Sequence, residues 1–260
     1  MTKDEVSFIG DDYYLDYLTA MNWIRKNKML SFNIMKIEEG DVILDVGCGT
    51  GDDVIILSKM VGKSGKVIGI DIDEKMIAQA KKKSQSISNV EFKIGNIYNL
   101  EFEDNYFDGA RADRVFQHLI EPDKALSEMI RVVKPNTPIV IMDPDWESLK
   151  IDSPNIELTR NFLTFYSESF ANSSSGKTLA NKFRRQNLKD IQVISDTLIM
   201  TDYEEINEVL MLEKYVEMAI EKKIFKESDL CAWIEELKDL SKKKLLFVYV
   251  VGFGVLGYKP

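Results

Sequence analysis

Residues 42–51 read Val42-Ile43-Leu44-Asp45-Val46-Gly47-Cys48-Gly49-Thr50-Gly51. The first five form a short apolar run that ends at glycine, which predicts a buried strand entering a turn. Residues 52–60 then carry apolar side chains at helical spacing. Glycines turn the backbone sharply and let a ligand approach it closely, so a strand, a glycine turn and a helix together predict a corner that binds a nucleoside or a dinucleotide.

The same alternation of strand and helix patterns continues along the first half of the chain. Further strands are expected at residues 66–71, 90–94, 106–112 and 138–142, and further helices at residues 73–83 and 122–133. Strands that alternate with helices imply a parallel, doubly wound sheet. The sequence therefore predicts an α/β protein with a Rossmann-like sheet.

The pattern changes after the fifth strand. We predict a long, mostly helical segment at residues 148–185, a strand at 191–200, helices at 204–225 and 228–240, and a last strand at 245–258. Ligands of such sheets bind at the carboxyl ends of the strands. The helical segment after the fifth strand should therefore roof that crevice. Its aromatic side chains either line an apolar substrate pocket or, for most of them, form core between cap and sheet, namely Phe162, Phe165, Tyr166 and Phe170.

The composition restricts the partners of the protein. Its 43 acidic and 34 basic residues give a formal net charge of -9, which disfavours a nucleic-acid substrate. Two cysteines and one histidine predict neither a disulfide framework nor a metal site. No apolar run is long enough for a membrane span, and residues 1–10 lack the apolar stretch of a signal peptide, so we expect a cytoplasmic protein with no membrane partner.

The glycine pattern also indicates which ligand the corner binds. A dinucleotide fingerprint would have a small residue at position 52, whereas Asp52 would face a pyrophosphate unfavourably. Asp71 ends the second strand, 20 residues after Gly51, where a carboxylate can accept hydrogen bonds from ribose hydroxyls. Ile72 offers an apolar face to an adenine ring. Asn96 and Ile97, after the third strand, are expected at the adenine edge.

These motifs resemble those of the class I S-adenosylmethionine-dependent methyltransferases. Residues 42–51 and 67–71 are similar to the first two motifs of that superfamily, and Gly95-Asn96-Ile97 resembles the third, with Asn96 in place of the usual Asp. Residues 107–119 and 131–135 resemble the fourth and fifth. Within the superfamily, the sequence is most similar to the small-molecule group related to ubiquinone and menaquinone methyltransferases.

The resemblance implies a seven-stranded sheet with an antiparallel last strand and S-adenosyl-L-methionine as cofactor, with S-adenosyl-L-homocysteine as product. It implies that Gly47 and the backbone near Arg111 hold the methionyl end. Cys48, Gly49 and Gly51 complete the expected cofactor turn. We expect one domain with an N-terminal helical lid (1–39), a cofactor-binding core (40–145), a helical cap (146–188) and C-terminal strands with inserted helices (189–260). We also expect at least one lid aromatic to touch ligand, among Tyr13, Tyr14, Tyr17 and Trp23.

Two residues are candidates for acid–base chemistry. His118 follows the fourth strand and has an ordinary pKa suited to a general base. In related enzymes a histidine at this place is proposed to act with an acidic residue after the fifth strand, which corresponds here to Asp143. Both could equally be structural, His118 as a helix histidine satisfied by a carbonyl and Asp143 as a helix cap.

The leading hypothesis is methyl transfer to an oxygen, nitrogen or carbon atom of a small, apolar metabolite. A regulatory protein that binds the cofactor without catalysis and a nicotinamide-dependent oxidoreductase are the alternatives, and Asp52 counts against the second. A nucleic-acid methyltransferase is disfavoured by the acidic composition. A monomer and a homodimer are both compatible with the sequence.

Overall fold

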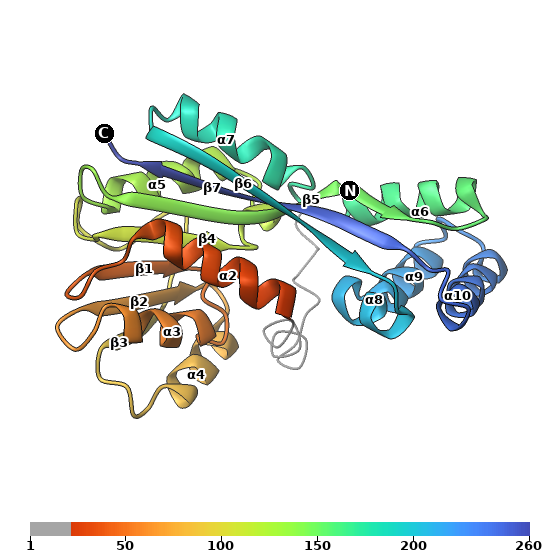
Figure 1. Ribbon diagram of the computed structural model, residues 1–260, viewed down its shortest axis with the longest axis horizontal. Coiled ribbons are helices and arrows are strands. Elements are labelled where there is room, and N and C mark those ends of the chain that lie inside the picture. Colours follow the sequence, from red (N-terminus) through yellow and green to blue (C-terminus); the bar gives the residue numbers. More distant parts are fainter. Residues whose placement is uncertain (1–21) are drawn as a thin grey trace.

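The computed structural model describes residues 22–260, whose strands form one seven-stranded sheet in the order β3-β2-β1-β4-β5-β7-β6 (Figure 1). The strands are β1 (Val42–Val46), β2 (Lys66–Asp71), β3 (Val90–Ile94), β4 (Gly109–Asp113), β5 (Pro138–Ile151), β6 (Lys189–Met200) and β7 (Val248–Tyr258). Strands β1 to β5 pair in parallel, while β7 runs antiparallel to both β5 and β6. The predicted Rossmann-like sheet with an antiparallel last strand is confirmed. Its strand order reverses between β1 and β4, which places a ligand crevice at their carboxyl ends.

Within residues 22–260, five helices cover the two faces of this sheet (Figure 1). They are α2 (Asn22–Met35), α3 (Asp52–Met60), α4 (Glu74–Lys83), α5 (Pro122–Val132) and α7 (Ser175–Arg185). Side chains alternate along each strand, so Ile43 packs in the core beneath α2, α3 and α4, while its neighbour Leu44 packs in the core beneath α5 and α7. The apolar runs of the sequence are therefore strands buried on both faces.

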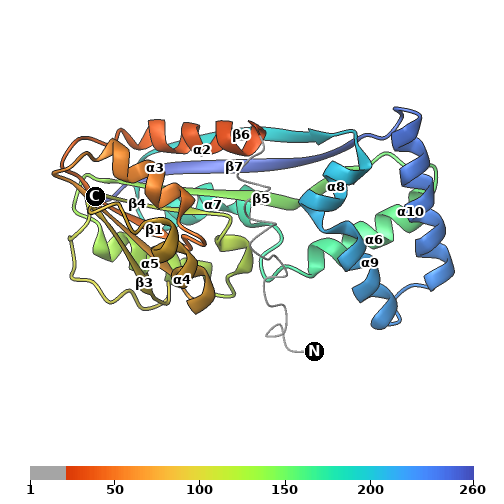
Figure 2. The same cartoon turned by 90° about the horizontal axis from the view of Figure 1, so that it is seen from below.

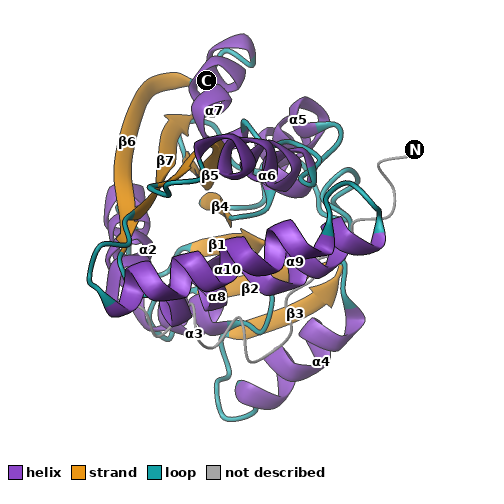
Figure 3. Ribbon diagram, turned by 90° about the vertical axis from the view of Figure 1, so that its right-hand side faces the viewer, coloured by secondary structure: helices purple, strands orange, loops and turns teal. Residues whose placement is uncertain are grey.

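The long strands β5, β6 and β7 extend beyond the others and carry a second helical lobe (Figure 2). Its helices are α6 (Ile156–Glu168), α8 (Tyr203–Leu210), α9 (Leu212–Glu221) and α10 (Glu227–Lys242). Seen from this end, α8, α9 and α10 lie in front of the sheet (Figure 3). The lobe has its own core, in which Phe162, Tyr166 and Trp233 are almost completely buried. Trp233 Nε1 donates a hydrogen bond of 2.9 Å to Thr159 Oγ1, which links α10 to α6.

Several boundaries differ from the predicted ones. The predicted helical cap is wrong over residues 146–151, because these residues continue β5 and pair with β7 after a bulge. Only α6 and α7 are helical in that segment, and α7 packs on the sheet instead of above the crevice. The predicted helix 204–225 is two helices, because Met211 adopts a left-handed conformation with φ 51°. Residues 106–108 precede β4 and form only an isolated bridge at Phe107.

The predicted N-terminal lid corresponds, within the described residues, to α2. Tyr13, Tyr14 and Tyr17 lie outside the described residues, as does the side chain of Trp23. Helix α2 packs through Phe32 and Met35 against the same core as α3. Along residues 22–260 we find no helix with the length and apolar character needed to cross a membrane.

Candidate functional site

The turn after β1 holds its three glycines in left-handed conformations, with φ 70° at Gly47, 51° at Gly49 and 83° at Gly51. Side chains other than glycine rarely adopt such angles. A Cβ at Gly51 would lie 2.7 Å from the Phe92 ring, and one at Gly47 would overlap the side chain of Val115. Helix α3 begins directly after this turn, so its N-terminus and the turn's backbone face the same edge of the sheet.

Asp71 fastens the turn to the end of β2. The backbone N–H of Gly49 donates a hydrogen bond of 2.9 Å to Asp71 Oδ2, and the N–H of Asp73 donates one of 2.9 Å to Asp71 Oδ1. Ile72, next to it, exposes 74% of its surface. An exposed apolar side chain beside an ordered carboxylate provides one surface for a flat apolar ring and one acceptor for hydroxyl groups.

The other predicted cofactor residues lie around this edge. The backbone N–H of Gly95 donates to Asp71 O at 2.9 Å, which brings the end of β3 beside the end of β2. Asn96 is exposed, and its Oδ1 accepts a hydrogen bond of 2.9 Å from the N–H of Tyr98, while Ile97 is buried. The Cys48 side chain is buried, and burial raises the pKa of its thiol, so the thiol stays protonated.

A buried ionic network lies beneath the turn. Arg111 Nη1 donates hydrogen bonds of 2.9 Å to Asp45 Oδ1 and 2.8 Å to Asp53 Oδ2. Lys28 Nζ, on α2, pairs with Asp53 Oδ1 at 2.8 Å. The Arg111 side chain is 1% exposed, so its guanidinium supports the turn from below and does not face the crevice. Burial would raise the pKa of Asp53, but the charges of Arg111 and Lys28 lower it below its usual range.

The importance of Asp45, Asp53 and Lys28 was missed from the sequence. A signal was present, because Asp45 and Arg111 each interrupt an otherwise apolar strand. Charges inside buried strands need partners, and the parallel register sets these two residues side by side. The partner from α2 could not be inferred, since no local pattern places that helix on α3.

The two catalytic candidates occupy different environments. His118 ends the short 3₁₀ helix η2 (Phe116–His118) and is exposed. Desolvation by the surrounding protein and the charge of Arg114 lower the pKa of His118, which favours a neutral imidazole. Asp143 is buried in β5, where Ser175 Oγ donates a hydrogen bond of 2.7 Å to its Oδ2. Asp143 Oδ1 is buried without a hydrogen-bond partner among the described residues, and burial raises the pKa of this carboxyl well above its usual value.

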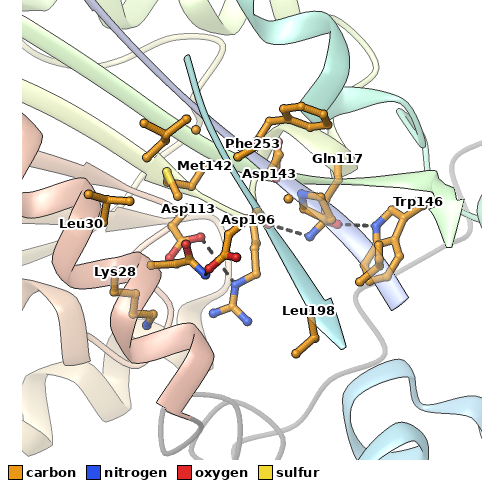
Figure 4. Close-up of a pocket in the computed structure, with 18 of the residues that line it drawn as sticks. Lys28, Leu30, Asp113, Gln117, Met142, Asp143, Trp146, Asp196, Leu198 and Phe253 are labelled. Carbon is orange, nitrogen blue, oxygen red and sulfur yellow. Dashed lines mark hydrogen bonds and ion pairs between the residues drawn. The ribbon is translucent and has the colours of Figure 1, made fainter. Parts of the chain in front are cut away.

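A cavity of about 110 Å³, here called the strand-end cavity, opens at the end of β4 and beside the middle of β5 (Figure 4). Strands β6 and β7 and helix α2 complete its wall. Its apolar lining includes Leu30, Met142, Trp146, Leu198 and Phe253, and its polar lining includes Asp113, Gln117, Asp143 and Asp196. This lining fits a ligand that is largely apolar with a small polar group.

Comparison with models of protein families identifies the family to which this chain belongs. Residues 37–228 match the model described as a methyltransferase domain. The chain belongs to this methyltransferase family. The family membership confirms the resemblance drawn from the glycine turn and the motifs that follow it.

Two curated proteins are related to this chain in sequence, and one of them is named as a methyltransferase. A demethylmenaquinone methyltransferase of Staphylococcus carnosus is 34% identical over 150 residues, covering 57% of this chain and 61% of that protein. An uncharacterised 37.1 kDa protein in transposon TN4556 of Streptomyces fradiae is 35% identical over 218 residues, covering 84% of this chain and 61% of that protein. The chain thus matches less than two thirds of the length of these relatives.

The solved structure of another methyltransferase shares this fold. A SAM-dependent methyltransferase from Aquifex aeolicus is 26% identical, with a TM-score of 0.54 over 71% of this chain and 90% of that one.

Proposed function

We propose that the protein is an S-adenosylmethionine-dependent methyltransferase that methylates an oxygen, nitrogen or carbon atom of a small, largely apolar metabolite. The observation that carries the proposal is the hydrogen bond between Gly49 and Asp71, which sets a carboxylate against a left-handed glycine turn. The names of the demethylmenaquinone methyltransferase and the SAM-dependent methyltransferase among its relatives support the same reaction.

The residues present fit this cofactor. Side chains at Gly47 and Gly51 would overlap Val115 and Phe92, so glycine at these positions lets the turn pack closely on the protein, and its exposed backbone is left to contact a ligand. In this proposal Gly47, Cys48, Gly49 and Gly51 hold the methionyl end through their backbone. Asp71 accepts hydrogen bonds from the ribose hydroxyls. The adenine ring lies on Ile72, with Asn96 and Ile97 at its edge.

Arg111 has a supporting role in the proposal. Its guanidinium donates to Asp45 and Asp53, so only the β4 backbone at this residue can face the methionyl end. When bound, the cofactor supplies an electrophilic methyl group on a sulfonium. The protein therefore has to align the acceptor atom in the strand-end cavity and exclude water from it.

We propose that His118 accepts the acceptor's proton when the methylated atom is oxygen or nitrogen. His118 is not among the described residues that line the strand-end cavity, but it directly follows Gln117, which does, and its lowered pKa keeps the imidazole neutral. Asp143 is less suited to this step, because its carboxyl is buried and its raised pKa favours the protonated form. We assign Asp143 to orienting the acceptor at the cavity wall. The cytoplasmic location and the oligomeric state stay predictions.

Transfer of a labelled methyl group tests the function. The protein is incubated with methyl-labelled S-adenosylmethionine and metabolite extracts, and labelled products are separated and identified. We expect a labelled small molecule whose yield at sub-saturating cofactor falls when Asp71 is replaced by alanine. His118→Ala should lower kcat for an oxygen or nitrogen acceptor while S-adenosylhomocysteine affinity stays unchanged. Unchanged kcat in that variant would remove His118 from catalysis.

A further inference from the structure

Two cavities share Trp146 in their lining. One is the strand-end cavity, and the other, here called the α6 cavity, has a volume of about 610 Å³ and lies between the second half of β5 and helix α6. Among the described residues that line them, Trp146 is common to both. Trp146 therefore borders both the small strand-end cavity and the larger α6 cavity of the second lobe.

The indole of Trp146 is held by polar and aromatic contacts. Its Nε1 donates a hydrogen bond of 2.6 Å to Gln117 Oε1, an interaction drawn in Figure 4. Its ring stacks on Phe170, with 4.8 Å between centroids and 18° between planes, and meets Tyr166 edge-on at 5.5 Å. Gln117 is itself fixed, because its Nε2 donates to Arg114 O at 3.0 Å. These contacts define one position for the indole and make Trp146 a fixed wall.

The α6 cavity has a mixed lining, and an alkyl chain could lie along its apolar part. Leu149, Ile151 and Leu163 form apolar parts of its wall, and Ile156 lines it while exposing 66% of its surface. Polar and charged side chains form the larger part of the lining, among them Lys150 and Arg160. An alkyl chain bound there would cover the apolar part, which favours binding in proportion to the apolar area removed from water.

We propose that Trp146 sets the length of the methyl acceptor by closing the strand-end cavity against the α6 cavity. This rests on the proposed function, with the acceptor's reacting group in the strand-end cavity. The native acceptor is then a compact molecule whose apolar part ends at the indole. Removing the indole joins the two spaces and admits an acceptor with an alkyl tail.

Binding of a homologous series of phenols tests this proposal. The probes are 4-alkylphenols with tails of one to ten carbons, titrated by calorimetry into the full chain saturated with S-adenosylhomocysteine. We expect the affinity of the native protein to stop rising after a short tail. In Trp146→Ala the affinity should keep rising by about fourfold per added methylene into the longer tails. Trp146→Leu should give an intermediate profile, and it also serves if the alanine variant does not fold.

Two controls separate loss of the wall from loss of an aromatic residue. Phe225→Ala removes a partly buried aromatic of the same lobe that is absent from the described lining of both cavities, and it should leave the chain-length profile native. Leu163→Trp, added to Trp146→Ala, refills the α6 cavity and should restore the native limit.

An unchanged profile in both folded Trp146 variants would overturn the proposal, as would native protein that binds long tails as tightly as Trp146→Ala does. Absence of phenol binding in every variant would also overturn it. Failure of the proposed function is distinguishable, because the protein would then either not bind S-adenosylhomocysteine in the first step of this experiment or form no labelled product in the methyl-transfer assay.

Discussion

The backbone N–H of Gly49 lies 2.9 Å from Oδ2 of Asp71, and this hydrogen bond joins the glycine turn after β1 to the end of β2. Asp71 Oδ1 also accepts from the N–H of Asp73, so the carboxylate is ordered on both sides. A carboxylate ordered in this way is preorganised to accept hydrogen bonds from two neighbouring hydroxyls. The expected binding of the ribose depends on this arrangement.

Replacement of Asp71 by alanine should weaken S-adenosylhomocysteine binding by about 1–3 kcal/mol, because hydrogen bonds to a charged acceptor are lost. Calorimetric titration measures this loss. Asp73→Ala is the matched control, since Asp73 is an exposed neighbouring carboxylate that caps α4 by accepting a hydrogen bond from the N–H of Lys75. Asp73→Ala should lower the stability of α4 and leave the affinity for S-adenosylhomocysteine near the native value. Equal affinities of Asp71→Ala and native protein would show that the ribose assignment is wrong.

Gly51→Ala should destabilise the fold by at least about 2 kcal/mol, the sum of a left-handed backbone and crowding in the core. The added Cβ would lie 2.7 Å from the Phe92 ring and 2.9 Å from Ala80 Cβ. Gly40→Ala shares the positive φ, at 100°, but its nearest neighbour would be Ser64 Oγ at 3.8 Å, so it should cost only about 1 kcal/mol. Urea unfolding compares the two variants, and equal losses would contradict the predicted clash.

Arg111→Met should destabilise the protein by about 3–5 kcal/mol, because it leaves buried carboxylates without their cation. Asp45 is affected most directly, since burial already raises its pKa and the charge of Arg111 opposes that rise. Lys93→Met removes an ion pair of 2.9 Å to Glu91 in which both side chains are partly exposed, and it should cost less than about 1 kcal/mol. Similar unfolding free energies for the two variants would contradict a structural role for the buried network.

The buried Asp143 should make the protein less stable as pH rises. Its pKa is raised in the folded state, so the native protein retains a proton that the unfolded chain releases above about pH 4. The free energy of unfolding should therefore fall by about 1 kcal/mol per pH unit from this group between about pH 5 and 6. Asp143→Asn should remove this contribution, whereas Ser175→Ala keeps the carboxyl and should retain it. If the free energy of unfolding depends on pH in the same way in native and Asp143→Asn protein, Asp143 is not a buried, protonated carboxyl.

Much of the sheet could be predicted because its local patterns agree with the final fold. The bounds predicted for β2 and β3 match the structure, since each is a short apolar or alternating run between clear turn signals. The glycine turn and Asp71 were found from their spacing alone, and they do lie in hydrogen-bond contact.

The second lobe could not be predicted in the same way. Residues 146–151 extend β5 only because β7 pairs with them, and that partner is about 100 residues distant in the chain. The left-handed Met211 also depends on tertiary packing, since nothing in its own side chain favours that conformation. The cavity wall at Trp146 arises from the meeting of β5, η2 and α6, so no sequence spacing indicates it.

Calorimetric titration of the native protein with S-adenosylhomocysteine, S-adenosylmethionine and NADH is the most direct test of the account. The arrangement of the glycine turn, Asp71 and Ile72 predicts binding of both adenosyl ligands and none of NADH, with Asp52 disfavouring a pyrophosphate at the turn. Binding of NADH without binding of either adenosyl ligand would contradict the proposed methyltransferase.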